Sequence, residues 1–278
     1  MKGIAEAGFV LTMEELVFLA SLIGSKELYG LEYDFDPMGE KEIAVKWKGV
    51  RKQLEDKKYI EVELNNEVTI DKELYEVLNS VCQPRLLIKY VLKDEEISHS
   101  RNFYFSEKIC IELDEDRLMK KTYILTPMVS LEKVLQNLDE CFFTSKNYGE
   151  EKLDFEVPLS DFEKLNAIDG SFSEVDKTDL LVGSGLSNEL AVDLLKAINE
   201  KTFFISVAIF EIENNTIEKL KTYFVVGGKD FLWSIRIPSN RCKKQDVSFK
   251  ICRMESISDE IIQFVANLRG VKEMFRNE

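Results

Sequence analysis

Apolar and polar positions in this chain follow one pattern that occurs twice. Each copy has four short apolar runs, rich in β-branched and aromatic residues and bounded by turn residues, which is typical of β-strands. In the first copy the runs lie at 85–92, 102–105, 109–113 and 122–125. In the second copy they lie at 203–210, 223–226, 231–237 and 247–251. The pattern predicts two four-stranded meanders.

A helix is predicted to close each meander. Its apolar residues follow the i, i+3, i+4, i+7 spacing, which places them on one side of a helix. In the first copy these are Leu131, Val134, Leu135 and Leu138. In the second they are Ile261, Phe264, Val265 and Leu268.

Two further helix pairs extend the repeat. Thr12 and Glu15 have the spacing of a capping box, and Ser160 with Glu163 has the same spacing in a segment that ends at Gly170. A third pair leads into the two meanders. One of these helices follows Asp71, and the other follows Ser187 or Asn188, since either residue is a good N-cap.

Together these elements predict an α+β fold, in which a central antiparallel sheet carries flanking helices. Each copy reads helix, variable segment, helix, four strands and helix. We therefore expect a pseudo-two-fold internal duplication. Residues 1–143 form an N-terminal α+β half and residues 153–278 a C-terminal half of one pseudo-symmetric domain, joined by a connector at 144–152.

The variable segments differ between the copies. In the first, residues 40–58 are predicted to form a helix, followed by a hairpin of 59–64 and 68–70. Asn65 and Asn66 supply the turn of this hairpin, because Asn tolerates the left-handed backbone. In the second, the polar stretch 171–187, with Gly183 and Gly185, is interpreted as a loop.

Composition and charge narrow the function classes. The formal net charge of -14 argues against duplex nucleic acid as the main partner, because phosphate binding needs a basic surface. No signal-peptide pattern or membrane-length apolar stretch is present, so we expect a cytoplasmic protein without a membrane partner. The five cysteines are expected to be buried free thiols: Cys82, Cys110, Cys141, Cys242 and Cys252.

No motif indicates catalysis, a cofactor or a metal. His99 is the only histidine, and its polar turn suggests a solvated side chain. Gly183 and Gly185 lack the Lys-Ser/Thr of a phosphate loop, and Gly227-Gly228 is interpreted as a hairpin turn. The acidic residues 114–116 lack calcium-loop spacing and are interpreted as a solvated loop. We therefore expect that the protein is not an enzyme.

Two segments are candidates for binding. The locally basic helix 40–58 and its hairpin have the shape of a winged helix, which leaves a transcriptional regulator as the alternative function. In the run 231–237, the side chains of Phe231, Trp233 and Ile235 share one face. They either pack under the closing helix, the favoured interpretation, or form an open hydrophobic platform that binds a partner.

Some of these residues resemble a known family. Residues 11–16 (LTMEEL), the hairpin with Asn65-Asn66, and 73–78 leading into Pro84 resemble the EspG family. Its members are cytosolic chaperones of type VII (ESX) secretion with a pseudo-two-fold α+β fold. The composition of this chain, rich in Lys, Glu and Asn, differs from that of the mycobacterial members, and the chain looks more like a homologue from a low-GC Gram-positive bacterium.

The resemblance implies a function and a kind of partner. It implies a non-catalytic chaperone or adaptor that binds a helical secreted protein before export. Mycobacterial members bind paired PE–PPE substrates. A WXG100-like or LXG-like helical protein is the equivalent expectation for this chain, and no cofactor is implied.

Overall fold

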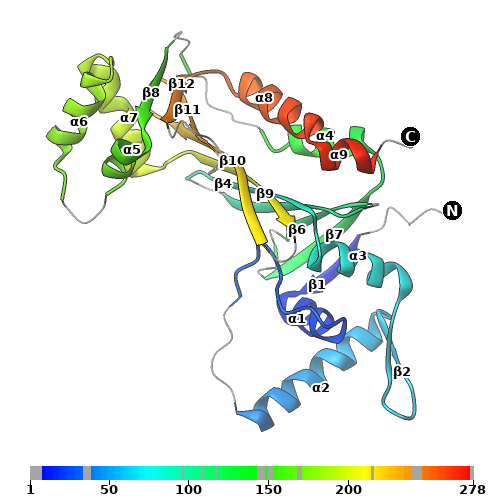
Figure 1. Ribbon diagram of the computed structural model, residues 1–278. Helices are drawn as coiled ribbons and strands as arrows, with labels where there is room; N and C mark the ends of the chain where they lie inside the picture. Colours follow the sequence, from blue (N-terminus) through cyan, green and yellow to red (C-terminus); the bar gives the residue numbers. More distant parts are fainter. Residues whose placement is uncertain are drawn as a thin grey trace. The chain divides into compact units, whose positions relative to one another are not determined.

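The computed structural model shows an α+β protein (Figure 1). It describes residues 8–33, 39–95, 97–107, 109–116, 118–119, 121–142, 148–149, 153–167, 171–213, 216–238 and 246–275. Two compact units are present. Unit 1 comprises residues 1–87, 101–131 and 273–278, and unit 2 comprises residues 88–100 and 132–272.

The strands of the main sheet come from both sequence copies. They are β1 (Phe9–Thr12), β4 (Leu86–Lys93), β5 (Ser98–Phe105), β6 (Cys110–Glu115), β7 (Thr122–Met128), β8 (Asp154–Pro158), β9 (Phe204–Glu213), β10 (Thr216–Gly227), β11 (Leu232–Ile237) and β12 (Asp246–Ile251). The strand order in this ten-stranded sheet is β1-β7-β6-β5-β4-β9-β10-β11-β12-β8. A separate hairpin consists of β2 (Ile60–Val62) and β3 (Val68–Ile70).

The helices also occur in two corresponding sets, one in each sequence copy. The first copy contains α1 (Met13–Leu22), α2 (Glu40–Asp56), α3 (Lys72–Cys82) and α4 (Leu131–Asp139). The second contains α5 (Leu159–Leu165), α6 (Glu174–Gly183), α7 (Asn188–Glu200) and α8 (Met254–Asn267), and the short α9 (Arg269–Met274) follows. The predicted fold class and the repeated element order are confirmed.

Each copy also contains a strand that the apolar pattern did not predict. β1 pairs with β7, the last strand of the first meander, and β8 pairs with β12, the last strand of the second. The internal orders β1-β7-β6-β5-β4 and β8-β12-β11-β10-β9 therefore correspond. The two units do not coincide with the sequence halves, so the division into residues 1–143 and 153–278 and its pseudo-two-fold axis stay predictions.

Most predicted helix starts and turns are confirmed. Thr12 caps α1 in a complete capping box with Glu15, and Asp71 accepts the N–H of Leu74 at the start of α3. Of the two residues considered as the cap of α7, it is Ser187 that accepts the N–H of Leu190. Asn66 takes the left-handed conformation expected of the β2–β3 turn, with a φ of 65°.

Three predictions in the second copy need correction. Ser160 does not cap a helix, because α5 already begins at Leu159 after Pro158. Residues 171–187 are not a loop: they contain α6 and end at Ser187, the N-cap of α7. α8 begins at Met254, seven residues before Ile261, the first residue of the predicted apolar stripe. Gly170 lies outside the described residues.

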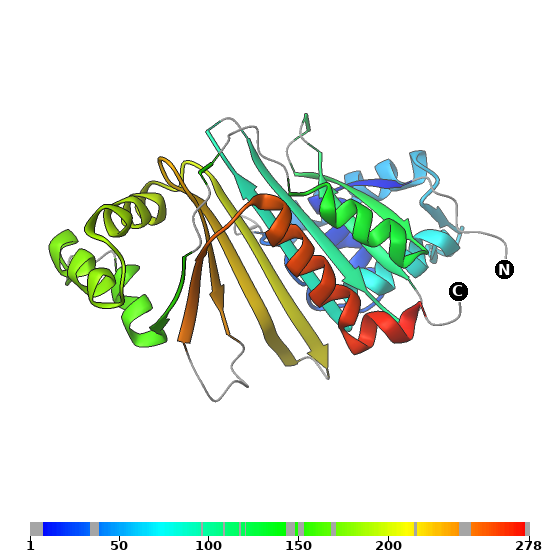
Figure 2. The ribbon, with the colours of Figure 1, turned by 90° about the horizontal axis from the view of Figure 1, so that it is seen from above.

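Helices α4 and α8 lie side by side (Figure 2). The hydroxyl of Ser258 on α8 donates to Asp139 at the end of α4 at 2.5 Å. Within unit 2, α8 is held on the sheet by Glu260, which forms ion pairs with Arg236 of β11 at 2.7 Å and with Lys221 of β10 at 3.5 Å. The Lys221 ammonium also lies over the ring of Phe264 at 4.5 Å.

Replacing Thr12 by Ala is expected to lower the free energy of unfolding by about 1 kcal/mol, because the first turn of α1 loses its side-chain acceptor. Urea unfolding followed by circular dichroism measures this change. Thr12→Ser retains the hydroxyl and serves as the control. Equal stability of the Ala and Ser variants would show that the cap contributes nothing.

Candidate partner-binding surface

The three residues proposed as a binding platform are not exposed as a group. Trp233 and Ile235 of β11 have exposed fractions of 0 % and 2 %, and Phe231, just before the strand, is half-buried. They belong to a core of buried residues contributed by α5, α6, α7 and the strands of unit 2. A partner contact made by these residues stays a prediction; among the described residues, Trp233 and Ile235 are covered by other parts of the chain.

The helices that cover this side of β11 are not the expected ones. The favoured interpretation placed Trp233 under the closing helix, yet α8 bonds to Arg236, whose side chain alternates with that of Trp233 along the strand. α5, α6 and α7, which lie together beside β8, cover the Trp233 side instead (Figure 1). Residues 171–187, whose polar composition predicts a loop, supply the covering helix α6.

Asp193 connects α7 to the strands beneath it. One carboxylate oxygen accepts the indole N–H of Trp233 at 2.9 Å, and the other accepts the backbone N–H of Lys229 at 2.8 Å. Gly227 is the last residue of β10 and pairs with Leu232, and Gly228 begins the β10–β11 connection, which confirms the predicted hairpin turn. A Cβ on Gly228 would lie 2.2 Å from Asp193, so this close approach requires glycine.

α6 is attached firmly to its neighbours. Ser173 caps it in a capping box with Asp176, and these hydrogen bonds hold the pKa of the Asp176 carboxyl below its ordinary value. Lys177 is buried, and its ammonium donates to the backbone oxygen of Ala167, just beyond α5, at 2.8 Å. The Ser173-to-Asp176 spacing is the sequence signal that would have identified this helix.

The side of α6 that faces away from the core carries exposed apolar residues. Val175 and Val182 are separated by two helical turns and share this side, with exposed fractions of 68 % and 40 %. Phe172 lies three residues before Val175 and is also exposed. We call Phe172, Val175 and Val182 the α6 outer face.

Acidic residues border the α6 outer face. Glu174 and Asp179 are exposed, and neither forms an ion pair with another described residue. The arrangement is an apolar stripe with an acidic border, displayed on a helix whose other side is embedded in the core. Such a surface suits the apolar side of a second helix with basic flanks.

Residues considered for chemistry occupy structural positions. His99 belongs to β5 and is only 6 % exposed, so the prediction of a solvated turn was wrong. Asp114 and Glu115 belong to β6 and not to a solvated loop, and Asp114 pairs with Arg101 at 3.3 Å. Gly183 ends α6, and Gly185, at a φ of 105°, lies in the turn before α7. In the described part of the chain, no three metal-ligating side chains converge.

The described cysteines are free thiols. Cys82, Cys110 and Cys141 are buried as expected, Cys252 is half-buried, and Cys242 lies outside the described residues. Burial raises the pKa of the Cys82 and Cys110 thiols above their ordinary value and that of Cys252 to about 11. Protonated thiols are poor nucleophiles at neutral pH.

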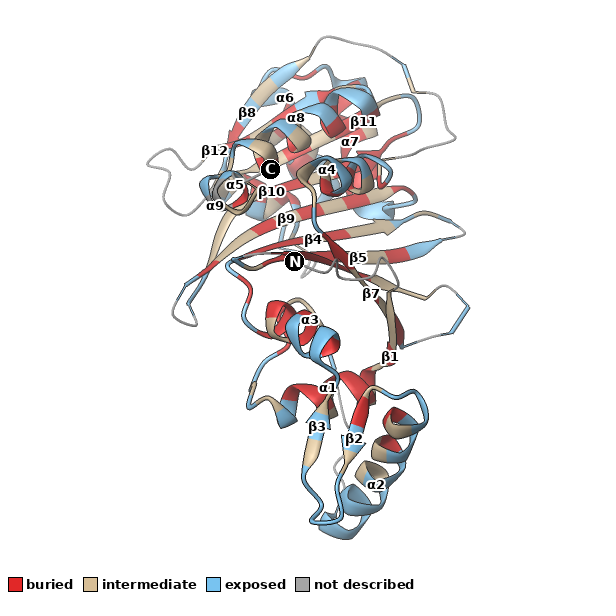
Figure 3. Ribbon diagram, turned by 90° about the vertical axis from the view of Figure 1, so that its right-hand side faces the viewer, coloured by how far each residue is buried: buried red, intermediate tan, exposed pale blue. Residues whose placement is uncertain are grey.

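The basic helix α2 is largely exposed, and the wing-like hairpin follows it (Figure 3). Two cations of α2, and Lys57 just after it, are already paired with acids of the chain. Lys46 pairs with Glu14, Arg51 with Glu55, and Lys57 with Glu15. These pairs reduce the positive charge available to phosphates, so a transcriptional regulator is not favoured.

The fold is similar to that of a known chaperone. No protein-family model and no curated protein matches the sequence. A solved structure does match, that of the Mycobacterium tuberculosis type VII secretion system chaperone EspG5 in complex with a PE25–PPE41 dimer. The TM-score is 0.62 at 8 % sequence identity, over 94 % of this chain and 97 % of that chain. The chain has an EspG-like fold.

This likeness confirms the fold and leaves finer assignments open. At 8 % identity it does not establish membership of the EspG family or a source organism. The matched structure is of a chaperone in complex with a dimer of other proteins. In the described residues, no helix combines the length and apolar character that crossing a bilayer requires.

Replacing Asp193 by Ala is expected to lower the free energy of unfolding by about 2 to 3 kcal/mol, because the Trp233 indole and the Lys229 amide lose a charged acceptor. Denaturant unfolding measures the change. Asp179→Ala, an exposed acid on neighbouring α6, is the matched control and should change stability by less than about 0.5 kcal/mol. Equal effects of the two variants would contradict the role of Asp193.

Proposed function

We propose that this protein is a cytoplasmic chaperone or adaptor that binds a helical type VII (ESX) secretion substrate before export and catalyses no reaction. The observation that carries the proposal is the EspG-like fold, which spans 94 % of this chain and 97 % of the matched chain. A structural likeness over nearly the whole of both chains supports a similar function more strongly than a shared short motif does.

The α6 outer face is the proposed contact surface. Its apolar residues are exposed at helical spacing, while the opposite side of α6 is part of a core that includes Leu181, Leu194 and Trp233. A surface on so well anchored a helix is ordered before the partner arrives. Binding then loses little free energy to the ordering of the surface itself.

The proposed partner is an amphipathic helix with basic residues beside its apolar stripe. The apolar side would pack on Val175 and Val182, and its cations would lie near Glu174 and Asp179. Helical secreted proteins of the WXG100, LXG or PE/PPE kind are the partner classes proposed. The net charge of -14 adds a general attraction for a basic partner.

The β11 residues have a supporting role in this proposal. Trp233 and Ile235 hold the α5–α7 helices on the sheet from beneath. Phe231, just before β11, is half-buried and packs at the margin of the same core, and this partial exposure supports it as the partner-binding member of the predicted set.

Co-expression with helical secretion substrates encoded beside the gene tests the function. We expect one of them to co-elute with the chain in size-exclusion chromatography at a fixed ratio. If every neighbouring WXG100- or LXG-type protein eluted separately, the chaperone proposal would fail.

Paired substitutions test the surface separately. Val175→Glu together with Val182→Glu should weaken the complex at least about tenfold, because two carboxylates enter an apolar contact. Isothermal titration calorimetry measures the affinity. Val45→Glu with Val129→Glu makes the same change at exposed valines elsewhere and should leave it unchanged. If the α6 variant bound the partner with unchanged affinity, the contact would lie on another surface, and the proposed function would still stand.

A further inference from the structure

β1 is an edge strand, and edges of this kind are normally open to strand addition. It lies at one end of the strand order and pairs with β7 through Phe9 to Thr12. The outer side of an edge strand presents backbone N–H and C=O groups, which can pair with a strand of another molecule. In this chain, side chains form hydrogen bonds with those backbone groups.

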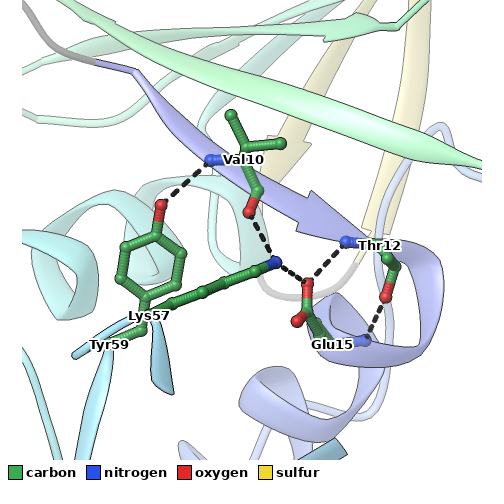
Figure 4. A network of polar contacts seen from close by, with 5 residues as sticks. All are labelled: Val10, Thr12, Glu15, Lys57 and Tyr59. Atoms are coloured by element: carbon green, nitrogen blue, oxygen red, sulfur yellow. Dashed lines mark hydrogen bonds and ion pairs between the residues drawn. The ribbon is translucent and has the colours of Figure 1, made fainter. Parts of the chain in front are cut away.

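Both outward backbone groups of Val10 have side-chain partners (Figure 4). The N–H of Val10 donates to the hydroxyl of Tyr59 at 3.2 Å, and the C=O of Val10 accepts from the ammonium of Lys57 at 3.1 Å. Alternate residues of an antiparallel edge strand point their backbone groups outward, so Val10 is the central position for pairing.

Glu15 completes the closure. Its carboxylate accepts the backbone N–H of Thr12 at 2.8 Å and the ammonium of Lys57 at 2.6 Å. Glu15 is 1 % exposed, and Lys57 supplies the counter-charge that burial of a carboxylate requires. The lysine is therefore held at the edge by two partners at once.

The end of α2 places these side chains at the edge. Lys57 follows the last residue of α2, and Lys58 has the left-handed conformation, at a φ of 61°, which reverses the chain direction. Tyr59 then packs edge-on against the ring of Phe9, with 5.6 Å between centroids. The chain direction and this ring contact both direct the Tyr59 hydroxyl to β1.

We propose that Lys57 and Tyr59, with Glu15, close the outer edge of β1 and so prevent it from pairing with β1 of a second copy of this chain. A second copy fits the edge, because two Val10 residues related by a two-fold axis would exchange both of their N–H···O bonds. The segment Phe9–Thr12 is apolar and β-branched at its centre, which favours such pairing.

A triple variant opens the edge: Lys57→Met, Tyr59→Phe and Glu15→Gln. Gln at position 15 can still accept the N–H of Thr12, and no buried carboxylate is left without its lysine. We expect concentration-dependent association in sedimentation velocity, with the average mass approaching twice that of the monomer. Wild-type protein should show no such increase over the same concentrations.

Two further variants identify the surface that associates. The control Lys52→Met, Tyr75→Phe and Glu73→Gln makes the same chemical changes at exposed positions of α2 and α3 and should behave as wild type. Adding Val10→Pro to the triple variant removes the outward N–H, a change that an edge strand tolerates, and should abolish the association.

Three results would overturn the proposal. These are a folded triple variant with the wild-type mass at every concentration, an association that Val10→Pro does not reverse, and a wild-type mass that falls when Val10→Pro alone is introduced. If circular dichroism shows the triple variant unfolded, Tyr59→Phe alone decides. It opens only the Val10 N–H and should give a weaker association that Val10→Pro reverses, whereas no association would again overturn the proposal.

Discussion

Burial of one side of strands β10 to β12 under α5, α6 and α7 is the interaction on which the rest of unit 2 depends. Trp233 combines the two requirements of such a layer, because its ring fills the core while its N–H is satisfied by Asp193. A buried indole without that acceptor would lose the benefit of its area. The same carboxylate holds the β10–β11 turn, so helix layer and hairpin are stabilised together.

This layer determines which side chains remain available to other molecules. The β11 side chains with the spacing of a binding platform pack inside the protein. The exposed apolar side chains of this layer lie on α6 instead. The described residues considered for chemistry are likewise occupied by structural roles, as with Asp114 in its pair with Arg101.

In unit 1, the main constraint is the outer edge of the short strand β1. β1 gains its order from β7 on one side and from α1, α2 and Tyr59 on the other. Lys57, just after α2, contacts Val10 of β1 and Glu15 of α1, which are both distant from it in sequence. The contact of Lys57 with the buried Glu15 carboxylate thus fixes which groups meet, a role for buried charges that is separate from net stability.

The sequence by itself determined the elements whose signals are local. Meander strands, closing helices, the Thr12 cap and the Asn65-Asn66 turn follow from periodicity and from hydrogen bonds between residues a few positions apart. Only the tertiary structure decided the edge positions of β1 and β8, the burial of His99 and the covering of Trp233 by α5–α7. Each of these depends on residues distant in the chain, and strands of four and five residues form only when a neighbouring strand supplies their hydrogen bonds.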